Sequence, residues 1–69
     1  MSTGTVKFYD TTRGFGFIQP DDGAKDVFVD STAVESAGLN TITQGQKLSF
    51  DVVTNSQTGK NSADNLQAM

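Results

Sequence analysis

The sequence predicts an all-β fold, a five-stranded antiparallel barrel with at most one short helical turn. Short runs of β-favouring residues alternate with turn signals at close spacing, which is typical of antiparallel strands joined by tight connections. Hardly any segment carries helix signals. Five short strands in a chain of 69 residues favour a small closed barrel. The sequence therefore predicts one domain spanning residues 1–69.

The first half of the chain has the rhythm of a β-meander. β-favouring runs occupy TVKFY (5–9), FGFIQP (15–20) and DVFV (26–29), and DTTRG and DDGAK separate them. Asp and Gly favour such turns because they tolerate the backbone angles that a turn requires. Three consecutive strands are therefore predicted here.

The second half predicts a helical turn and two more strands. Thr32 and Glu35 have the T-x-x-E spacing of a capping box, and Gly38 stands where such a turn would end. A strand is expected over KLSFDVVT (47–54), followed by the turn NSQTGK and a weaker last strand from about Asn61 to Gln67. Because this last segment does not alternate cleanly, we expect a bulge or bend in it.

Alternation along the strands predicts the core. Side chains of successive strand residues point to opposite faces, so every second residue can be buried. The inward positions are Ile18, Val27, Val29, Leu48, Phe50 and Val52, with Val6 and Leu66 as further members.

Composition excludes several function classes. The chain has no cysteine and no histidine, so disulfides, thiol or imidazole catalysis and the usual zinc sites are not expected. The Gly59-Lys60 pair lacks the rest of a phosphate-binding loop, and no nucleophile is paired with a base, so we expect no enzyme, metal or cofactor. No signal peptide or membrane-spanning run is visible, which predicts a cytoplasmic protein without a membrane partner.

Three phenylalanines are expected on one face. If Ile18 faces the core, Phe15 and Phe17 face outward together, and Phe28 does so on the next strand. Gly14 and Gly16 remove side chains from the other face, so that flat groups could approach the backbone. Exposed rings stack on nucleobases with little sequence preference. The alternative is that these rings are ordinary core, because phenylalanine is usually buried.

The positive charges are few but suitably placed. The net charge is −3, which argues against binding of a polyanion by bulk positive charge. Lys7, Arg13 and Lys60 lie beside or close to the ring-bearing segments and could each contact a phosphate, or could be ordinary solvated charges. Lys25 and Lys47 lie near acidic residues and are interpreted as solubility charges.

These segments resemble the bacterial cold shock protein family. RGFGFI (13–18) and DVFV (26–29) are similar to its K-G-F-G-F-I and V-F-V-H-F motifs, and GTVKFYD (4–10) is similar to its G-x-V-K-W-F-N. QPDDGAKD (19–26) resembles its second turn, and QGQKLSFDVV (44–53) its fourth strand. The resemblance covers Gly4 to about Leu66. It implies a five-stranded OB-fold barrel that binds single-stranded RNA and DNA and acts as an RNA chaperone or antiterminator.

The resemblance also implies a set of binding residues and two departures. The expected binding face comprises Lys7, Phe8, Tyr9, Arg13, Phe15, Phe17 and Phe28, with Lys60 at its rim. Asp30 and Ser31 replace the His and Phe of V-F-V-H-F. Asp30 could cap the helical turn or accept a hydrogen bond from a base amino group.

Two functions follow from these residues. The first is a monomeric protein that binds single strands with low sequence specificity, more weakly than typical members or with an altered base preference. The second, motivated by Asp30, Ser31 and the negative charge, is a regulatory or protein-interaction paralogue that has lost nucleic-acid binding.

Overall fold

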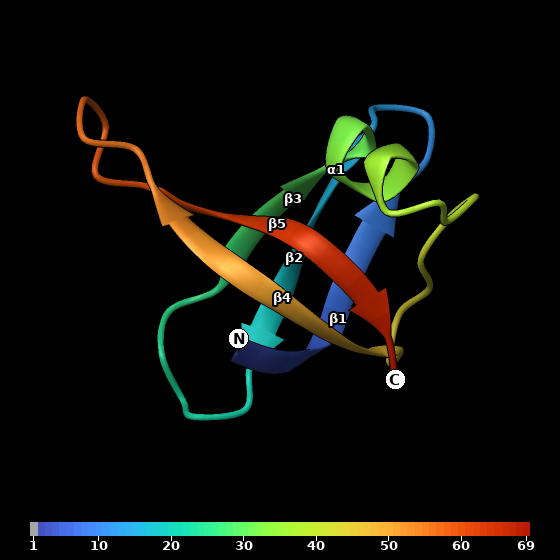
Figure 1. Ribbon diagram of the computed structural model, residues 1–69, viewed down its shortest axis with the longest axis horizontal. Coiled ribbons are helices and arrows are strands. Elements are labelled where there is room, and N and C mark those ends of the chain that lie inside the picture. The colour runs from blue at the N-terminus through green and yellow to red at the C-terminus, as the bar shows by residue number, and fades with distance from the viewer. Residues whose placement is uncertain (1) are drawn as a thin grey trace.

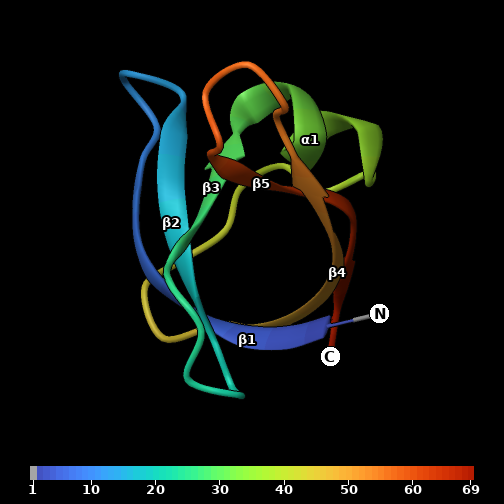
Figure 2. The same cartoon turned by 90° about the vertical axis from the view of Figure 1, so that its left-hand side faces the viewer.

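The computed structural model describes residues 2–69, whose strands close into one barrel in the order β1-β2-β3-β5-β4 (Figures 1 and 2). Family resemblance and strand pattern both predicted this architecture, and the structure confirms it. The elements are β1 (Ser2–Asp10), β2 (Phe15–Pro20), β3 (Val27–Asp30), α1 (Ser31–Ser36), β4 (Lys47–Thr54) and β5 (Asn61–Ala68).

The first strand is longer than its apolar pattern indicates. β2 and β4 have the predicted bounds, but β1 begins at Ser2 rather than Thr5. The additional residues pair with β4, from Ser2 opposite Phe50 to Gly4 opposite Leu48. Small polar residues carry no strand signal of their own, so this pairing is set by the partner strand.

The barrel closes through a parallel contact. β3 and β5 run in the same direction, with Phe28 opposite Ser62, whereas the other neighbouring strands pair antiparallel. The prediction of a wholly antiparallel barrel is therefore wrong at this junction. The chain leaves β3 through α1, reverses in β4 and returns in β5, so β5 enters beside β3 in the same direction (Figure 1).

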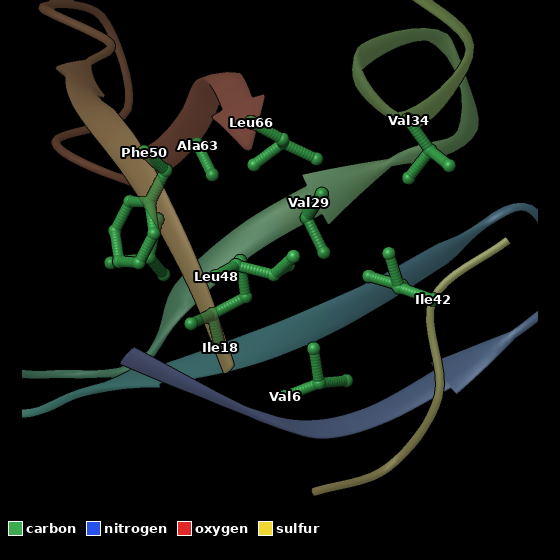
Figure 3. Close-up of a cluster of buried hydrophobic side chains, with 10 residues drawn as sticks. Val6, Ile18, Val29, Val34, Ile42, Leu48, Phe50, Ala63 and Leu66 are labelled. Carbon is green, nitrogen blue, oxygen red and sulfur yellow. The ribbon is translucent and has the colours of Figure 1, made fainter. Parts of the chain in front are cut away.

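The core is a single apolar cluster inside the barrel (Figure 3). Burial of such side chains is the main term that stabilises a small domain, at about 25 cal/mol per Å². The predicted core is confirmed except at one position, and Val34, Ile42 and Ala63 join it. Its members are Val6, Ile18, Val27, Val29, Val34, Ile42, Leu48, Phe50, Ala63 and Leu66.

The prediction that Val52 is buried is wrong. Its side chain is 42% exposed, although alternation after Leu48 and Phe50 assigns it to the same face. Val52 pairs with Ala63 close to the end of β4, where the strand continues into the hairpin that extends away from the barrel (Figure 1).

Two bulges change the direction of side chains. The predicted irregularity in β5 is confirmed: the register with β4 shifts between Ser49 and Asp51, and Asn65 has a φ of 51°. A second bulge, in β1, was not predicted. Val6 pairs with Ile18 and Phe8 with Phe17, which leaves Lys7 as an extra residue. Phe8 consequently faces the opposite side from Val6.

The helix begins two residues earlier than the capping box predicted. Asp30, not Thr32, is its N-cap, and its carboxylate accepts the Ala33 N–H at 2.9 Å. The predicted end is confirmed: Gly38 has a φ of 79° and donates to the Glu35 carbonyl. Leu39 donates to Val34, which completes a Schellman motif. Within residues 2–69 no helix is long and apolar enough to cross a membrane.

Candidate nucleic-acid interface

Four phenylalanine rings, those of Phe8, Phe15, Phe17 and Phe28, form one cluster on the outside of β1, β2 and β3. The ring centroid of Phe17 lies 5.5 Å from that of Phe8 and 5.9 Å from that of Phe28. Phe15 is 5.9 Å from Phe28 with an angle of 16° between the rings, a stacked arrangement. These distances are typical of favourable aromatic pairs. We call these four side chains the phenylalanine cluster.

Strand register places the rings together. Phe8 is opposite Phe17, which is opposite Phe28, and Phe15 lies two residues before Phe17 on the same face. Phe8 joins this face only because of the bulge at Lys7. Ile18, on the other face of β2, is fully buried.

The rings are not part of the core. Phe8 is 41% exposed, and the other three rings are half-buried, since they partly cover one another. Phe50 is the fully buried phenylalanine. The alternative that the predicted rings are ordinary core is therefore wrong.

Gly16 allows β1 to pack closely against β2 behind the cluster. A Cβ at this position would lie 2.3 Å from the Phe8 carbonyl oxygen and 2.8 Å from the Tyr9 Cα. The space that the sequence suggested for an approaching ligand is thus filled by β1 itself. Gly14 has a different role, because its φ of 77° allows the turn between β1 and β2.

Tyr9 lies apart from the phenylalanine cluster. It follows Phe8 in β1, and its side chain packs against the core. Burial, followed by the negative charges of Glu35 and Asp30, raises the pKa of the Tyr9 hydroxyl. Tyr9 therefore faces the helix end of the barrel rather than the open ring surface.

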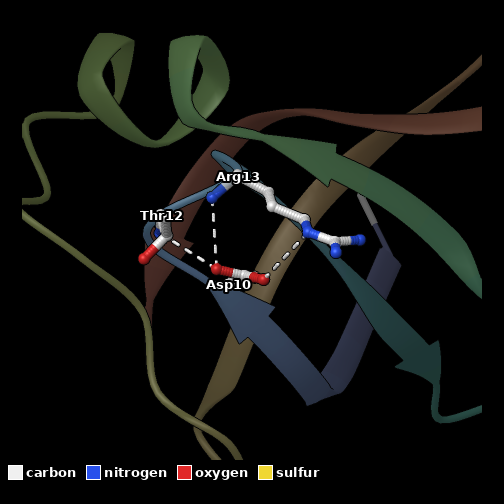
Figure 4. A network of polar contacts seen from close by, with 3 residues as sticks. All are labelled: Asp10, Thr12 and Arg13. Carbon is white, nitrogen blue, oxygen red and sulfur yellow. Dashed lines mark hydrogen bonds and ion pairs between the residues drawn. The ribbon is translucent and has the colours of Figure 1, made fainter.

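Lys7 and Arg13 are each paired with an acid. The Lys7 ammonium lies 2.9 Å from the Asp26 carboxylate. Arg13 Nε lies 3.7 Å from Asp10, whose other oxygen accepts the N–H groups of Thr12 and Arg13 (Figure 4). Both pairs are solvent-exposed and hence weak, so a phosphate could replace the carboxylate at little cost.

Lys60 and Lys25 flank a groove beside the cluster. The groove has a volume of about 520 Å³. Within residues 2–69 neither lysine makes an ion pair. The sequence prediction missed Lys25, because its place beside Phe28 depends on how two loops meet. The groove is lined by Phe17, Lys25, Asp26, Phe28, Gly59, Lys60 and Asn61.

Lys47 forms an ion pair with Asp21 and does not line the groove. Its ammonium lies 2.7 Å from Asp21, which also accepts the Thr3 hydroxyl at 2.8 Å. The hydrogen bond from Lys47, then that from Thr3, lowers the pKa of Asp21. This cation joins the ends of β1 and β4 to the loop after β2.

Asp30 and Ser31 stand at the end of the cluster. Asp30 is opposite Phe15 and two residues after Phe28, so its side chain continues the ring-bearing face. The capping role considered for Asp30 is confirmed by its bond to Ala33. Ser31 donates its N–H to the Gly14 carbonyl at 2.8 Å and so ties the start of α1 to the turn between β1 and β2.

Residues 2–69 match the family described as "'Cold-shock' DNA-binding domain". The chain is 57% identical over 68 residues to "Cold shock protein CspA" of Rhizobium meliloti, with 99% of each chain covered. It is 43% identical over 61 residues to "Cold shock-like protein CspE" of Escherichia coli, covering 88% of this chain and 87% of the relative. The chain therefore belongs to the cold-shock DNA-binding domain family.

Proposed function

We propose that this protein binds single-stranded RNA and DNA with low sequence specificity, as a cytoplasmic monomer that acts as an RNA chaperone or antiterminator. The observation that carries this proposal is the phenylalanine cluster, four adjoining rings on an open face of three strands. Stacking on a ring contributes about 1 to 3 kcal/mol per base whatever the base. Unpaired bases can reach such a surface, whereas bases within a duplex cannot.

The cations support the same proposal in a secondary role. Lys25 and Lys60 stand on the groove next to Phe17 and Phe28, where a backbone phosphate would follow a stacked base. The exposed ion pair of Lys7 with Asp26 would have to open before Lys7 could bind a phosphate. Stacking therefore supplies most of the affinity, and ionic contacts a smaller part.

The proposed mechanism needs no chemical step. A protein that binds the unpaired strand and not the hairpin shifts the hairpin equilibrium by RT ln(1 + [P]/Kd), where [P] is the concentration of free protein. At a protein concentration of about 100 Kd this amounts to about 2.7 kcal/mol, enough to open a marginal hairpin.

An NMR titration with the RNA heptamer U7 tests the proposal. We expect amide shifts to concentrate on Phe8, Phe15, Phe17 and Phe28. The variant Phe17→Leu keeps an apolar side chain but removes the flat ring, and we expect it to weaken binding about tenfold. Val52→Ala is the control, since Val52 is an exposed apolar residue that lies outside the cluster.

Absence of shifts at near-millimolar U7 would overturn this proposal. It would favour the regulatory or protein-interaction role that Asp30 and Ser31 suggested. Equal weakening by Phe17→Leu and Val52→Ala would also contradict it, because the loss would then not depend on the ring.

A further inference from the structure

We propose that Asp30 makes one nucleotide position of the interface selective for a base that carries an exocyclic amino group, cytosine being the test case, over uracil or thymine. This inference rests on the proposed function. It concerns a residue at which the chain departs from the V-F-V-H-F motif, and a hollow beside it.

The hollow lies at the end of the phenylalanine cluster. Its volume of about 410 Å³ falls within the roughly 300 to 1,000 Å³ of small-ligand sites. It shares Phe28, Lys60 and Asn61 with the groove of about 520 Å³, so the two depressions adjoin each other. Its walls are Phe28, Asp30, Asn55, Thr58, Lys60, Asn61 and Ser62.

Three of these walls suit three features of a nucleotide, namely the face of its base, its phosphate and the edge of its base. The Phe28 ring offers a face on which a base can stack. Lys60, which has no acidic partner within residues 2–69, can bind the phosphate. Asp30 follows Phe28 at the next outward position of β3 and lines the same hollow, so it can meet the edge of a base stacked on that ring.

The Asp30 carboxylate has one oxygen available. Oδ1 accepts the Ala33 N–H at 2.9 Å, which fixes the side chain. Oδ2 makes no hydrogen bond or ion pair with the described part of the chain, residues 2–69. The N-cap bond therefore holds a carboxylate oxygen in a set direction beside the hollow, so that little entropy is lost when it accepts a ligand bond.

An ionised carboxylate only accepts hydrogen bonds. The amino group of cytosine donates one, whereas uracil and thymine present a carbonyl oxygen at the same ring position. That oxygen would be repelled by Asp30, so the site discriminates by attraction to one base and by repulsion of the other. Cytosine and uracil have the same ring size, so stacking on Phe28 changes little between them.

A cytosine scan tests the inference. The probes are U7 and the seven RNA heptamers in which one uracil of U7 is replaced by cytosine, with binding measured by NMR titration or calorimetry. We expect replacement at one position to tighten binding at least about fivefold, which corresponds to the lower end of a base-specific contact. Equal affinity for U7 and all seven substituted heptamers would overturn the inference.

Two variants assign the preference to Asp30. Asp30→Asn retains an N-cap as good as Asp while removing the charge, so the helix should stay formed. We expect this variant to lose most of the cytosine preference and to bind U7 more tightly than the unmodified protein. Asp22→Asn is the matched control: it removes the same charge from an exposed turn and should leave the scan unchanged.

The outcomes separate this inference from the proposed function. Binding of U7 without a cytosine preference overturns the inference alone, and so does a preference that Asp30→Asn retains. Absence of binding by any of the eight heptamers overturns both.

Discussion

Gly16 shows how a single residue positions the ring surface. Its backbone is extended in β2, so glycine is required there by space and not by an unusual φ. β1 lies so close that any side chain at this position would meet the backbone of Phe8 and Tyr9. The close approach of the two strands sets Phe8 against Phe17 on the other face.

We expect Gly16→Ala to destabilise the fold by about 3 kcal/mol, at the upper end of overpacking costs, because backbone and not a flexible side chain must move. The control is Gly23→Ala, where a Cβ meets nothing within 4 Å and only the positive φ is strained. Its cost should be about 1 kcal/mol. Urea unfolding measures both; equal losses would contradict the steric account.

Tyr9 can be titrated by ultraviolet absorbance without interference, since the chain has one tyrosine and no tryptophan. Burial, then Glu35 and Asp30, raises its pKa, so the midpoint should lie above the ordinary value of 10.0. The contribution of neutral Tyr9 to the free energy of unfolding is then fully present below pH 10, and it is lost as the pH rises through the pKa of Tyr9 in the folded protein.

Glu35→Gln should lower this midpoint, because it removes one of the two negative charges that oppose ionisation of Tyr9. Asp22 does not contribute to the shift, so Asp22→Asn serves as the control. A midpoint that stays the same in Glu35→Gln would show that charge does not contribute.

At the scale of elements, α1 is too short to be stable by itself and depends on its two ends. Asp30 caps the first turn, and Gly38 ends the last one. Val34 attaches the helix to the core. The same aspartate that ends β3 thus begins α1, which joins the ring-bearing sheet to the helix.

We expect Asp30→Ala to lower the free energy of unfolding by about 1 kcal/mol, whereas Asp30→Asn should change it little, because asparagine caps as well as aspartate. Thermal or urea unfolding of the two variants measures this difference. If both variants lose the same amount, charge and not capping is the cause.

Much of the element order could be predicted from the sequence because apolar alternation is a local signal. β4 was predicted at its observed bounds, and Phe15, Phe17 and Phe28 were assigned to the outer face. Features that depend on contacts between elements could not be predicted from local patterns. Ser2 is a strand residue only because β4 lies beside it, and Ile42 is buried from a loop that has no regular apolar pattern.

Other features of the candidate site also depend on how strands and loops meet in the folded protein. The bulge at Lys7 exists only in the register of β1 with β2, and without it strict alternation would turn Phe8 inward. The resemblance to a family supplied Phe8 as a binding residue where alternation could not. Lys25 was missed because it approaches Phe28 across a loop whose path no local pattern specifies.

Across the whole molecule, a net charge of −3 coexists with an interface proposed for a polyanion. The positive charges that lack acidic partners within residues 2–69 are Lys25 and Lys60, and both stand at the groove. Lys7, Arg13 and Lys47 are paired with acids. Long-range repulsion is screened beyond about 10 Å at 0.1 M salt, so this local arrangement matters more than the total.

We expect a shallow salt dependence of single-strand binding. Two or three phosphate contacts give a slope of about −1.4 to −2.1 for log K against log salt. The double variant Lys25→Gln, Lys60→Gln should make the slope shallower, between about −0.7 and zero, while Lys47→Gln should leave it unchanged. Titrations at several salt concentrations measure it, and a slope near −6 would contradict binding dominated by stacking.

The parallel contact between β3 and β5 has a consequence for the order of folding. The phenylalanine cluster lies within the first 28 residues, on three strands joined by short turns, so its contacts are local and can form early. Closure requires Phe28 to meet Ser62, near the end of the chain. During synthesis the ring-bearing strands are therefore complete long before the barrel can shut, and the apolar interior stays open until β5 has been made.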